Sequence, residues 1–190
     1  MIEIRRLDRL RRQDLRLAPG YTSEATYQAT KSETFGEFRF SLMRQQLDAP
    51  YVKQWPDLDE DFRHLSQVVT QGLSLGAYDD DQLVGIAISE KREWNSTLWV
   101  WEFAIAESHR RQGLGRQLME RVSQAAKTEG MLIVVCETQN TNAPAIDFYR
   151  SIGFEVDGID LSYYGSSHVG ADSVAVFMKR KLEWSIDASG

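Results

Sequence analysis

The stretch Arg110-Arg-Gln-Gly-Leu-Gly115 decides how this sequence is interpreted. It follows an apolar run typical of a strand, Leu98–Ala106, and opens a run with helical spacing, Gly113–Thr128. The first N–H groups of a helix lack intrahelical partners and carry partial positive charge, so a helix that begins behind a glycine turn is a favourable anion site. The position of this hexamer therefore predicts a phosphate-binding loop.

The composition of the loop supports that prediction. Gly113 and Gly115 have no Cβ and let the backbone approach a phosphate closely. The cofactor-binding candidates are all the residues of the loop, with charge from its arginines: Arg110, Arg111, Gln112, Gly113, Leu114, Gly115 and Arg116. The hexamer alone leaves a second interpretation open, a tight turn with a solvated basic face.

Further blocks make the pattern specific. Arg110-x-x-Gly113-x-Gly115 resembles the (Gln/Arg)-x-x-Gly-x-(Gly/Ala) signature of the GNAT acetyltransferases. Asn142-x-x-Ala145-x-x-x-Tyr149-x-x-x-Gly153-Phe154 resembles the C-terminal helix motif of that superfamily. Three other stretches resemble the streptothricin acetyltransferases, which acetylate the β-lysine amine of a cationic antibiotic: Trp99-Val-Trp-Glu102-Phe, Cys136-Glu-Thr-Gln-Asn140 and Asp157-Gly-Ile-Asp-Leu-Ser-Tyr-Tyr164. The resemblance covers residues 83–182.

The resemblance implies an α/β protein with the GNAT fold, a mixed central sheet flanked by helices. It implies a single domain over residues 1–190, in which 1–70 lie on the acceptor side and 83–182 form the core that binds acetyl-coenzyme A. Acetyl-coenzyme A would be the acetyl donor, held by its pyrophosphate on the loop, and no metal is expected.

The resemblance also implies roles for single residues. The strand before the loop would offer the backbone groups of Phe103, Ala104 and Ile105 to the pantetheine arm. Asn142, with Ala145 beside it, would hydrogen-bond near the same arm, cap its helix, or do both. Tyr149 matches the tyrosine that protonates the departing thiolate; aromatic packing is the alternative for this side chain.

The hydrophobic periodicity predicts an order of elements that matches this core. The expected strands are Ile2–Leu7, Gly36–Met43, Ser74–Tyr78, Leu83–Lys91, Leu98–Ala106, Met131–Thr138, Phe154–Tyr164 and Val174–Leu182. The expected helices run from Gly113 to a cap at Gly130, and from Asn142 to about Gly153. The stretch Tyr51–Asp61 is interpreted as a loop leading to a helix, and Ser185–Gly190 as a frayed tail.

Two glutamates are candidates for the base that takes a proton from the amine. Strand alternation puts Trp99, Trp101, Phe103 and Ile105 on one face, and Val100, Glu102, Ala104 and Ala106 on the other. Burial among small apolar residues would raise the pKa of Glu102 toward a value useful for catalysis. Glu137 on the next strand is the rival, and the two could act together, one orienting the ammonium group. An ion pair with an arginine is the structural alternative for either glutamate.

The acceptor side carries a weaker signal. Carboxylates beside aromatic rings suit a cationic ligand through charge and cation–π contact. The acceptor-binding candidates are Glu102, Glu137, Asp160, Tyr163 and Tyr164. The acidic run Asp57, Asp59, Glu60 and Asp61 is interpreted as a solvated loop.

Composition limits the class of protein. A length of 190 residues suits one domain with a sizeable core, and a net charge of −6 argues against a nucleic-acid partner and favours a cationic one. The Arg-rich start, Arg5–Arg16, is interpreted as a solvated helix face. Cys136 is expected to be a small buried residue, and His64, His109 and His168 have no metal spacing. No membrane-spanning run or secretory signal is evident, so we expect a cytoplasmic protein.

The sequence favours one function and keeps three alternatives. The first is acetyl transfer from acetyl-coenzyme A to a primary amine of a cationic small molecule, the β-lysine amine of streptothricin. The alternatives are an N-acetyltransferase acting on a protein or peptide, one acting on an aminoglycoside, and a coenzyme A-binding module without catalysis. We expect no nucleic-acid or membrane partner; the oligomeric state stays open, a homodimer included.

Overall fold

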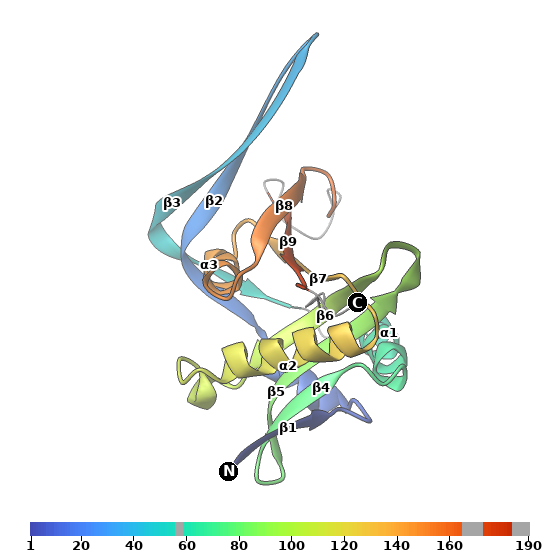
Figure 1. The fold of residues 1–190 in the computed structure, drawn as a ribbon. Helices are drawn as coiled ribbons and strands as arrows, with labels where there is room; N and C mark the ends of the chain where they lie inside the picture. Colours follow the sequence, from blue (N-terminus) through green and yellow to red (C-terminus); the bar gives the residue numbers. More distant parts are fainter. Residues whose placement is uncertain (56–58, 165–172, 184–190) are drawn as a thin grey trace. The chain divides into compact units, whose positions relative to one another are not determined.

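The structure, a computed structural model, describes residues 1–55, 59–164 and 173–183 (Figure 1). The chain divides into two compact units. Unit 1 comprises Met1–Pro19, Pro56–Cys136 and Arg180–Gly190, and unit 2 comprises Gly20–Trp55 and Glu137–Lys179. The predictions for Asp57, His168 and the tail Ser185–Gly190 lie outside the described residues. No helix in the described part of the chain is long and apolar enough to cross a membrane.

Unit 1 is built on a mixed sheet. Its strands follow the spatial order β1 (Ile2–Arg6), β4 (Leu75–Asp79), β5 (Gln82–Arg92), β6 (Thr97–Ile105) and β7 (Ile133–Gln139), of which β7 belongs to unit 1 as far as Cys136. The pairs are antiparallel except for β6 with β7, which run parallel from Thr97/Ile133 to Val100/Cys136. The parallel pair needs a crossover, and the helix α2 (Leu114–Thr128) supplies it. The strands predicted at Ser74–Tyr78 and Leu83–Lys91 are confirmed as the paired strands β4 and β5, and Cys136 is buried as expected.

Two helices cover the sheet of unit 1. The helix α1 (Asp59–Thr70) buries Leu65, Val68 and Val69 in a cluster with Ile86 and Ile88 of β5. The helix α2 buries the spaced apolar side chains Leu118, Met119, Val122 and Ala126. It begins behind Gly113 (φ 84°) and ends before Gly130 (φ 74°), which confirms both predicted boundaries.

Unit 2 holds the C-terminal strands and a long ribbon. Strand β9 (Ala175–Lys181) pairs antiparallel with β8 (Glu155–Asp160), and α3 (Ala143–Ser151) precedes them. Strands β2 (Gly20–Thr34) and β3 (Glu37–Gln54) form a separate two-stranded sheet, and their ribbon extends far beyond α3, β8 and β9 (Figure 1). The order β4-β5-β6-α2-β7-α3-β8-β9 is the one that periodicity predicted.

Buried Asn140 links three segments of unit 2. Its side-chain amide donates to the Tyr27 carbonyl at 3.0 Å and accepts from the Val174 N–H at 2.8 Å. Its backbone N–H donates to the Val174 carbonyl, and its carbonyl accepts from the Tyr27 N–H, both at 2.9 Å. One residue thus hydrogen-bonds β2 on one side and the start of β9 on the other.

Three predicted boundaries are wrong. The strand predicted at Gly36–Met43 is part of β3, which continues to Gln54, so the loop expected over Tyr51–Asp61 is largely strand and helix. The closing strand expected over Phe154–Tyr164 ends at Asp160, followed by a turn. The helix face expected over the Arg-rich start is mostly absent, because Arg5 and Arg6 lie on β1 and only Arg12–Leu17 form a short 3-10 helix, η1.

Candidate active site

The predicted phosphate loop is exposed and is held by side-chain contacts at its base. A 3-10 turn, η3 (Glu107–His109), leads from β6 into the loop. The Arg110 Nε donates to the Ile105 carbonyl at 2.8 Å, so this arginine ties the loop to the end of β6. The Gln112 amide donates to the Ser108 carbonyl at 2.9 Å. Arg111 adopts φ 58°, a left-handed conformation rare for a residue with a side chain, which marks a constrained loop.

The start of α2 has the properties of an anion site. Its N-cap is Gly113, which supplies no side-chain hydrogen bond to the first amides of a 15-residue helix. A Cβ at Gly113 would meet only the Gln117 amide, at 3.9 Å, so the space in front of the turn is open. Arg111, Gly113 and Arg116 are exposed, while Leu114 is buried as the first anchor of the helix. These residues fit a diphosphate, because backbone amides and guanidinium groups are both presented to solvent.

A β-bulge in β6 corrects the predicted faces of that strand. Ile88 pairs with Glu102 and the next residue, Ser89, pairs with Val100, so Trp101 is the extra residue of the bulge. The extra residue reverses the alternation, and Val100 therefore lies on the face opposite Glu102. Trp99, which pairs with Glu90, shares the face of Glu102 instead. The predicted grouping of Val100 with Glu102 and of Trp99 with Phe103 is wrong.

Two of the three residues predicted to contact the pantetheine arm direct their backbone groups away from β5. The Ala106 N–H donates to the Val84 carbonyl at 2.8 Å, and backbone groups along an antiparallel strand alternate in direction. Ala104 therefore directs its N–H and carbonyl to β5, while Phe103 and Ile105 direct theirs away from it. Two contacts agree: the Phe103 N–H donates to the Glu102 carboxyl at 3.2 Å, and the Ile105 carbonyl accepts from Arg110.

Glu102 is half-buried on the sheet face that carries the α1 cluster. It pairs with Ile88, and Ala104 follows it in the same cluster. Burial raises the pKa of Glu102 to about 7, and the hydrogen bond from the Phe103 N–H only partly opposes this shift. This carboxyl group therefore titrates near neutral pH, where a group that accepts a proton from an amine is most effective.

Glu137, the rival carboxylate, has a side-chain partner. The Tyr164 hydroxyl donates to the Glu137 Oε1. Burial raises the pKa of Glu137, and the Tyr164 hydrogen bond counteracts that shift. Burial also raises the pKa of Tyr164, so the phenol remains protonated and acts as the donor. The described partner of Glu137 is thus a phenol, whereas the alternative interpretation was an ion pair with an arginine.

The helix α3 presents the second motif. The Asn142 side chain accepts from the Ala145 N–H at 3.3 Å, which confirms its role as the N-cap. Tyr149 is buried, with its ring 5.4 Å from the rings of both Phe148 and Phe154. The packing alternative for Tyr149 is therefore realised in the structure, and the role of its hydroxyl stays a prediction.

The other two acceptor candidates lie at the turn after β8. Asp160 is exposed, and its carboxylate accepts from the Ser162 N–H at 2.8 Å. Tyr163 is exposed and meets the rings of Tyr164 and Phe177 edge-on, at 5.3 and 5.5 Å. The Asp160 carboxylate therefore stabilises the turn after β8, and the Tyr163 ring packs against the Tyr164 ring.

Sequence reasoning missed an aromatic cluster in unit 2. The Tyr21 ring lies 6.0 Å from that of Tyr51 and 6.1 Å from that of Trp55. Burial raises the pKa of Tyr21, and the negative charge of Glu137 adds a smaller contribution. The Tyr21 hydroxyl donates to the Gln139 Oε1 at 2.7 Å. The Gln139 Nε2 is buried without a hydrogen-bond partner among the described residues. The sequence marked Gln139 as part of the Cys136–Asn140 motif. Nothing in the sequence, however, indicates that this motif contacts residues 21–55.

The described side chains fall into two groups. Unit 1 contains Glu102, Phe103–Ile105 and the loop Arg110–Arg116. Unit 2 contains Glu137, Asn142, Ala145, Tyr149, Asp160, Tyr163 and Tyr164, together with the aromatic cluster. Among the residues that the structure describes, no three His, Cys, Asp or Glu side chains converge as metal ligands.

Comparison with known proteins decides the family. The model of the acetyltransferase (GNAT) family matches residues 40–154, more than half of the chain. The chain belongs to the GNAT acetyltransferases. A streptothricin acetyltransferase of Streptomyces lavendulae is 30% identical over 143 residues, 73% of this chain and 76% of the relative.

Solved GNAT structures agree. The crystal structure of nourseothricin acetyltransferase superposes with a TM-score of 0.75 at 26% identity, over 96% of this chain and 99% of that one. A Bacillus anthracis protein assigned as a streptothricin acetyltransferase, solved with acetyl coenzyme A, gives a TM-score of 0.72 at 21% identity, over 96% and 98%. This protein therefore has the GNAT fold and is an acetyltransferase that uses acetyl-coenzyme A.

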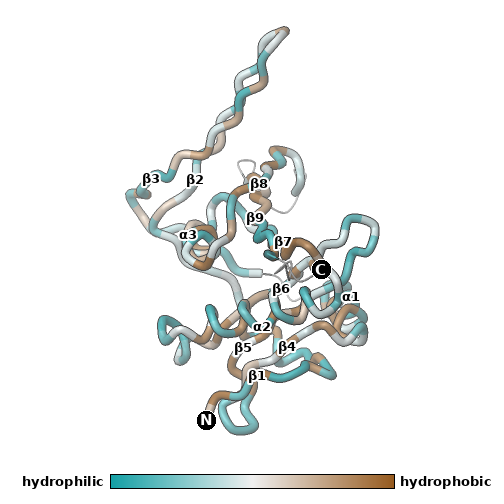
Figure 2. The backbone as a smooth tube through the Cα atoms, viewed as in Figure 1, coloured by the Kyte–Doolittle hydropathy of each residue, from teal (hydrophilic) through white to brown (hydrophobic). Residues whose placement is uncertain are grey.

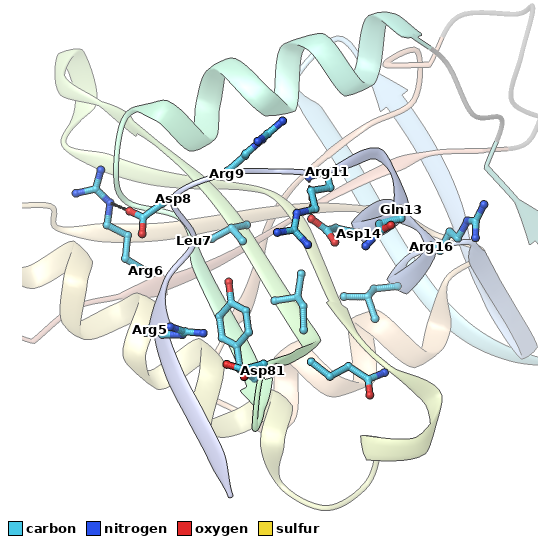
Figure 3. Close-up of a pocket in the computed structure, with 14 residues that line it drawn as sticks. Arg5, Arg6, Leu7, Asp8, Arg9, Arg11, Gln13, Asp14, Arg16 and Asp81 are labelled. Atoms are coloured by element: carbon cyan, nitrogen blue, oxygen red, sulfur yellow. Dashed lines mark hydrogen bonds and ion pairs between the residues drawn. The ribbon is translucent and has the colours of Figure 1, made fainter.

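A cavity of about 860 Å³ in unit 1 of this GNAT protein is formed by the N-terminal segment and the β4–β5 hairpin (Figure 3). Its charged lining is mixed: Arg5, Arg6, Arg9, Arg11 and Arg16 alternate with Asp8, Asp14 and Asp81. Arg6 pairs with Asp8 at 3.0 Å, and the Arg5 guanidinium lies 4.1 Å from the centroid of the Tyr78 ring. The described lining includes none of the predicted site residues, and its five arginines outnumber its three aspartates.

Proposed function

We propose that this enzyme transfers the acetyl group of acetyl-coenzyme A to a primary amine of a cationic small molecule, the β-lysine amine of streptothricin. The observation that carries the choice of a cationic acceptor is the cluster in unit 2. Glu137 is half-buried beside Tyr164, the rings of Tyr21, Tyr51 and Trp55 lie together, and the Tyr21 hydroxyl contacts Gln139 of the same strand as Glu137. A carboxylate and aromatic rings attract an ammonium group by charge and by cation–π contact.

The donor would be held by the loop before α2. The amides at the start of the helix and the exposed guanidinium groups of Arg111 and Arg116 bind the diphosphate, while Gly113 keeps the approach open. The Phe103 and Ile105 backbone groups, directed away from β5, supply hydrogen bonds for the pantetheine arm. Fixing the thioester in this way removes much of the entropy cost of bringing it to the amine.

Glu102 is the proposed base. An ammonium group cannot attack a thioester until it loses a proton, and a carboxylate whose pKa is about 7 accepts that proton near neutral pH, directly or through water. The amine nitrogen then forms a bond to the acetyl carbon, and the carbon–sulfur bond breaks. Glu102 holds the first proton that the ammonium group loses, the nitrogen releases a second proton to water as the amide forms, and the electron pair of the broken bond is on sulfur.

Tyr149 is the proposed acid for that sulfur. A free thiol has a pKa of about 8.5 and a phenol about 10, so the transfer needs close geometry to be effective. Packing between Phe148 and Phe154 fixes the ring of Tyr149 and so restricts the position of its hydroxyl. Asn142, the cap of the same helix, fixes where that helix begins.

Acceptor turnover tests this proposal against its alternatives. Purified protein is given acetyl-coenzyme A and, in separate reactions, streptothricin, an aminoglycoside, a lysine peptide and a peptide with a free N-terminus, and thiol release is followed. We expect the highest kcat/KM with streptothricin. Equal or faster turnover of a peptide or an aminoglycoside would replace the acceptor, and absence of acceptor-dependent thiol release in every reaction would leave a non-catalytic coenzyme A-binding module. We further propose a cytoplasmic location, where the donor is available, and a homodimer.

A further inference from the structure

The β2–β3 ribbon has one apolar and one polar face. Residues that pair directly share a face, so the rungs Ala29/Leu42, Lys31/Phe40 and Glu33/Phe38 form a single surface, here called the arm face. The rungs Thr30/Ser41 and Ser32/Arg39 form the opposite surface, where the Thr30 and Ser41 hydroxyls lie 2.7 Å apart. Figure 2 shows hydrophobic and hydrophilic segments alternating along both strands.

The arm face is buried at its base and bare toward its tip. At the base, Ala25 and Tyr27 are buried, and the Tyr27 hydroxyl donates to the Asp147 carboxylate of α3 at 2.6 Å. The same face continues outward, where Phe40 is 49% exposed and Phe38 66% exposed. Phe35, at the tip, is fully exposed. An isolated two-stranded ribbon is only marginally stable in water, and aromatic side chains lined up on one face indicate a partner.

We propose that the arm face is a dimer interface, occupied by the arm face of a second copy of this chain. This inference names the surface by which the proposed homodimer would form, and it uses nothing from the proposed acetyl transfer. In a two-fold contact each surface must complement itself, because the same patch is present on both sides. The question is therefore whether the arm face can pack against its own antiparallel copy.

The order of side chains meets that condition. Consider a two-fold axis that lies in the contact plane, perpendicular to the ribbon, between the Lys31/Phe40 and Glu33/Phe38 rungs. Lys31 of one protomer then faces Glu33 of its partner, and Phe40 faces Phe38, with the same contacts repeated by symmetry. The charges are opposite and the rings meet rings, so no like charges are brought together. The ion pair already present between Lys31 and Glu33, at 2.6 Å, would become a four-charge cluster.

The apolar surface of two arms reaches the lower limit for a specific interface. An aromatic side chain covers about 150–250 Å². Phe35, Phe38 and Phe40, with half-buried Leu42, offer roughly 500 Å² of apolar surface per arm on this scale. Two arms together reach about 1,000 Å², near the lower limit for a specific interface.

Molar mass by light scattering after size exclusion tests the proposal. The wild-type chain should elute as a dimer, with twice the 21.8 kDa of the protomer. Phe38→Glu/Phe40→Glu should reduce it to a monomer at the same concentration. The matched control, Ser32→Glu/Ser41→Glu, places two charges on the opposite face of the same strands and should remain dimeric. A monomeric wild type at about 100 μM, a hundred times a micromolar Kd, would overturn the proposal, as would a control that dissociates equally.

Charge exchange tests the identity of the partner even if the phenylalanine variant fails to fold. Glu33→Lys alone and Lys31→Glu alone should each weaken the dimer at least tenfold, because like charges then meet across the axis. The double variant Lys31→Glu/Glu33→Lys should restore the dimer, because opposite charges again face each other. Failure of the double variant to restore it would overturn the two-fold register. Loss of acetyl transfer with the dimer intact would instead contradict the proposed function and leave the interface standing.

Discussion

The β6 region around Glu102 and the β7 region around Glu137 each remove a carboxyl group from water, but they satisfy it differently. The partner of Glu102 is a backbone N–H, that of its neighbour Phe103, and its pKa rises to about 7. The partner of Glu137 is the phenol of Tyr164, which opposes the rise caused by burial. This difference shows that burial alone does not determine whether a carboxyl group acts as a base or binds a cation; its hydrogen-bond partner matters as well. A weakly held carboxyl group can exchange a proton near neutral pH, whereas one held by a phenol is better suited to remain charged and bind a cation.

The largest expected effect comes from removing the proposed base. Glu102→Gln keeps the shape of the side chain and cannot accept a proton, so kcat/KM should fall by about 10²–10⁴. In the wild type, activity should rise through pH 7 as Glu102 ionises, and the variant should lose this limb of the pH–rate profile. If Glu137→Gln removes the limb and Glu102→Gln does not, the two glutamates have been assigned the wrong way round.

Tyr149→Phe should have the next largest effect. It removes the proposed donor to the leaving sulfur and keeps the ring that packs against Phe148 and Phe154, so kcat should fall roughly a hundredfold. The KM for acetyl-coenzyme A should change little. Tyr164→Phe is the matched control, because it removes a phenol from the same unit. An unchanged kcat in Tyr149→Phe would exclude this hydroxyl from the reaction.

Stability should report the raised pKa of Glu102 without any assay of activity. The folded-state pKa of Glu102, about 7, lies above the ordinary glutamate pKa of 4.5, so the folded state binds the proton more tightly and stability falls as pH rises between these values. The loss amounts to about 3 kcal/mol by pH 8. Glu102→Gln should therefore melt at a higher temperature than the wild type at pH 8, and the difference should diminish toward pH 4.5. Equal pH dependence in both proteins would contradict the buried carboxyl group.

Glu137→Gln should act on binding rather than on the chemical step. The amide keeps the hydrogen bond from Tyr164 and loses the negative charge, so the KM for a cationic acceptor should rise about tenfold. The kcat at saturating acceptor should stay within about threefold of the wild type. Steady-state kinetics with the acceptor varied gives both values, and a fall in kcat with unchanged KM would move Glu137 from binding to catalysis.

The smallest effect is expected for Tyr164→Phe. Its hydroxyl lowers the pKa of Glu137, so its removal should raise that pKa further. A larger fraction of Glu137 is then neutral at low pH, and the acceptor KM should increase by about two- to fivefold at pH 6 and less at pH 8. A change independent of pH would mean that Tyr164 contacts the acceptor by itself.

The sequence predicts the GNAT core well because its signals are local. Gly113 and Gly130 set the ends of α2, Asn142 caps α3, and the apolar runs predict the strands from β4 to β9. Strand β2 gives no such signal, since its buried positions are Ser23, Ala25 and Tyr27, and its outer half is polar on one face. Its pairing with β3 is what makes it a strand.

The candidate site likewise has one part that the sequence predicts and one part that it does not. The loop Arg110–Arg116 and the motif around Tyr149 are contiguous, so their residues could be named from the sequence. The bulge at Trp101 could not, because one inserted residue changes no composition and is visible only against the register of β5. The cluster of Tyr21, Tyr51 and Trp55 with Gln139 joins residues distant in the chain, and local pattern holds no information on such contacts.

Asn140 has a consequence for how unit 2 opens. Its four hydrogen bonds reach Tyr27 and Val174 at once, so neither segment can detach without leaving buried polar groups of the asparagine unsatisfied. The amide protons of Tyr27, Asn140 and Val174 should then exchange with deuterium in a single cooperative event, with one opening free energy. Segments from opposite ends of the chain thereby form one foldon, while the outer part of the ribbon, in the isolated protomer, exchanges independently of it.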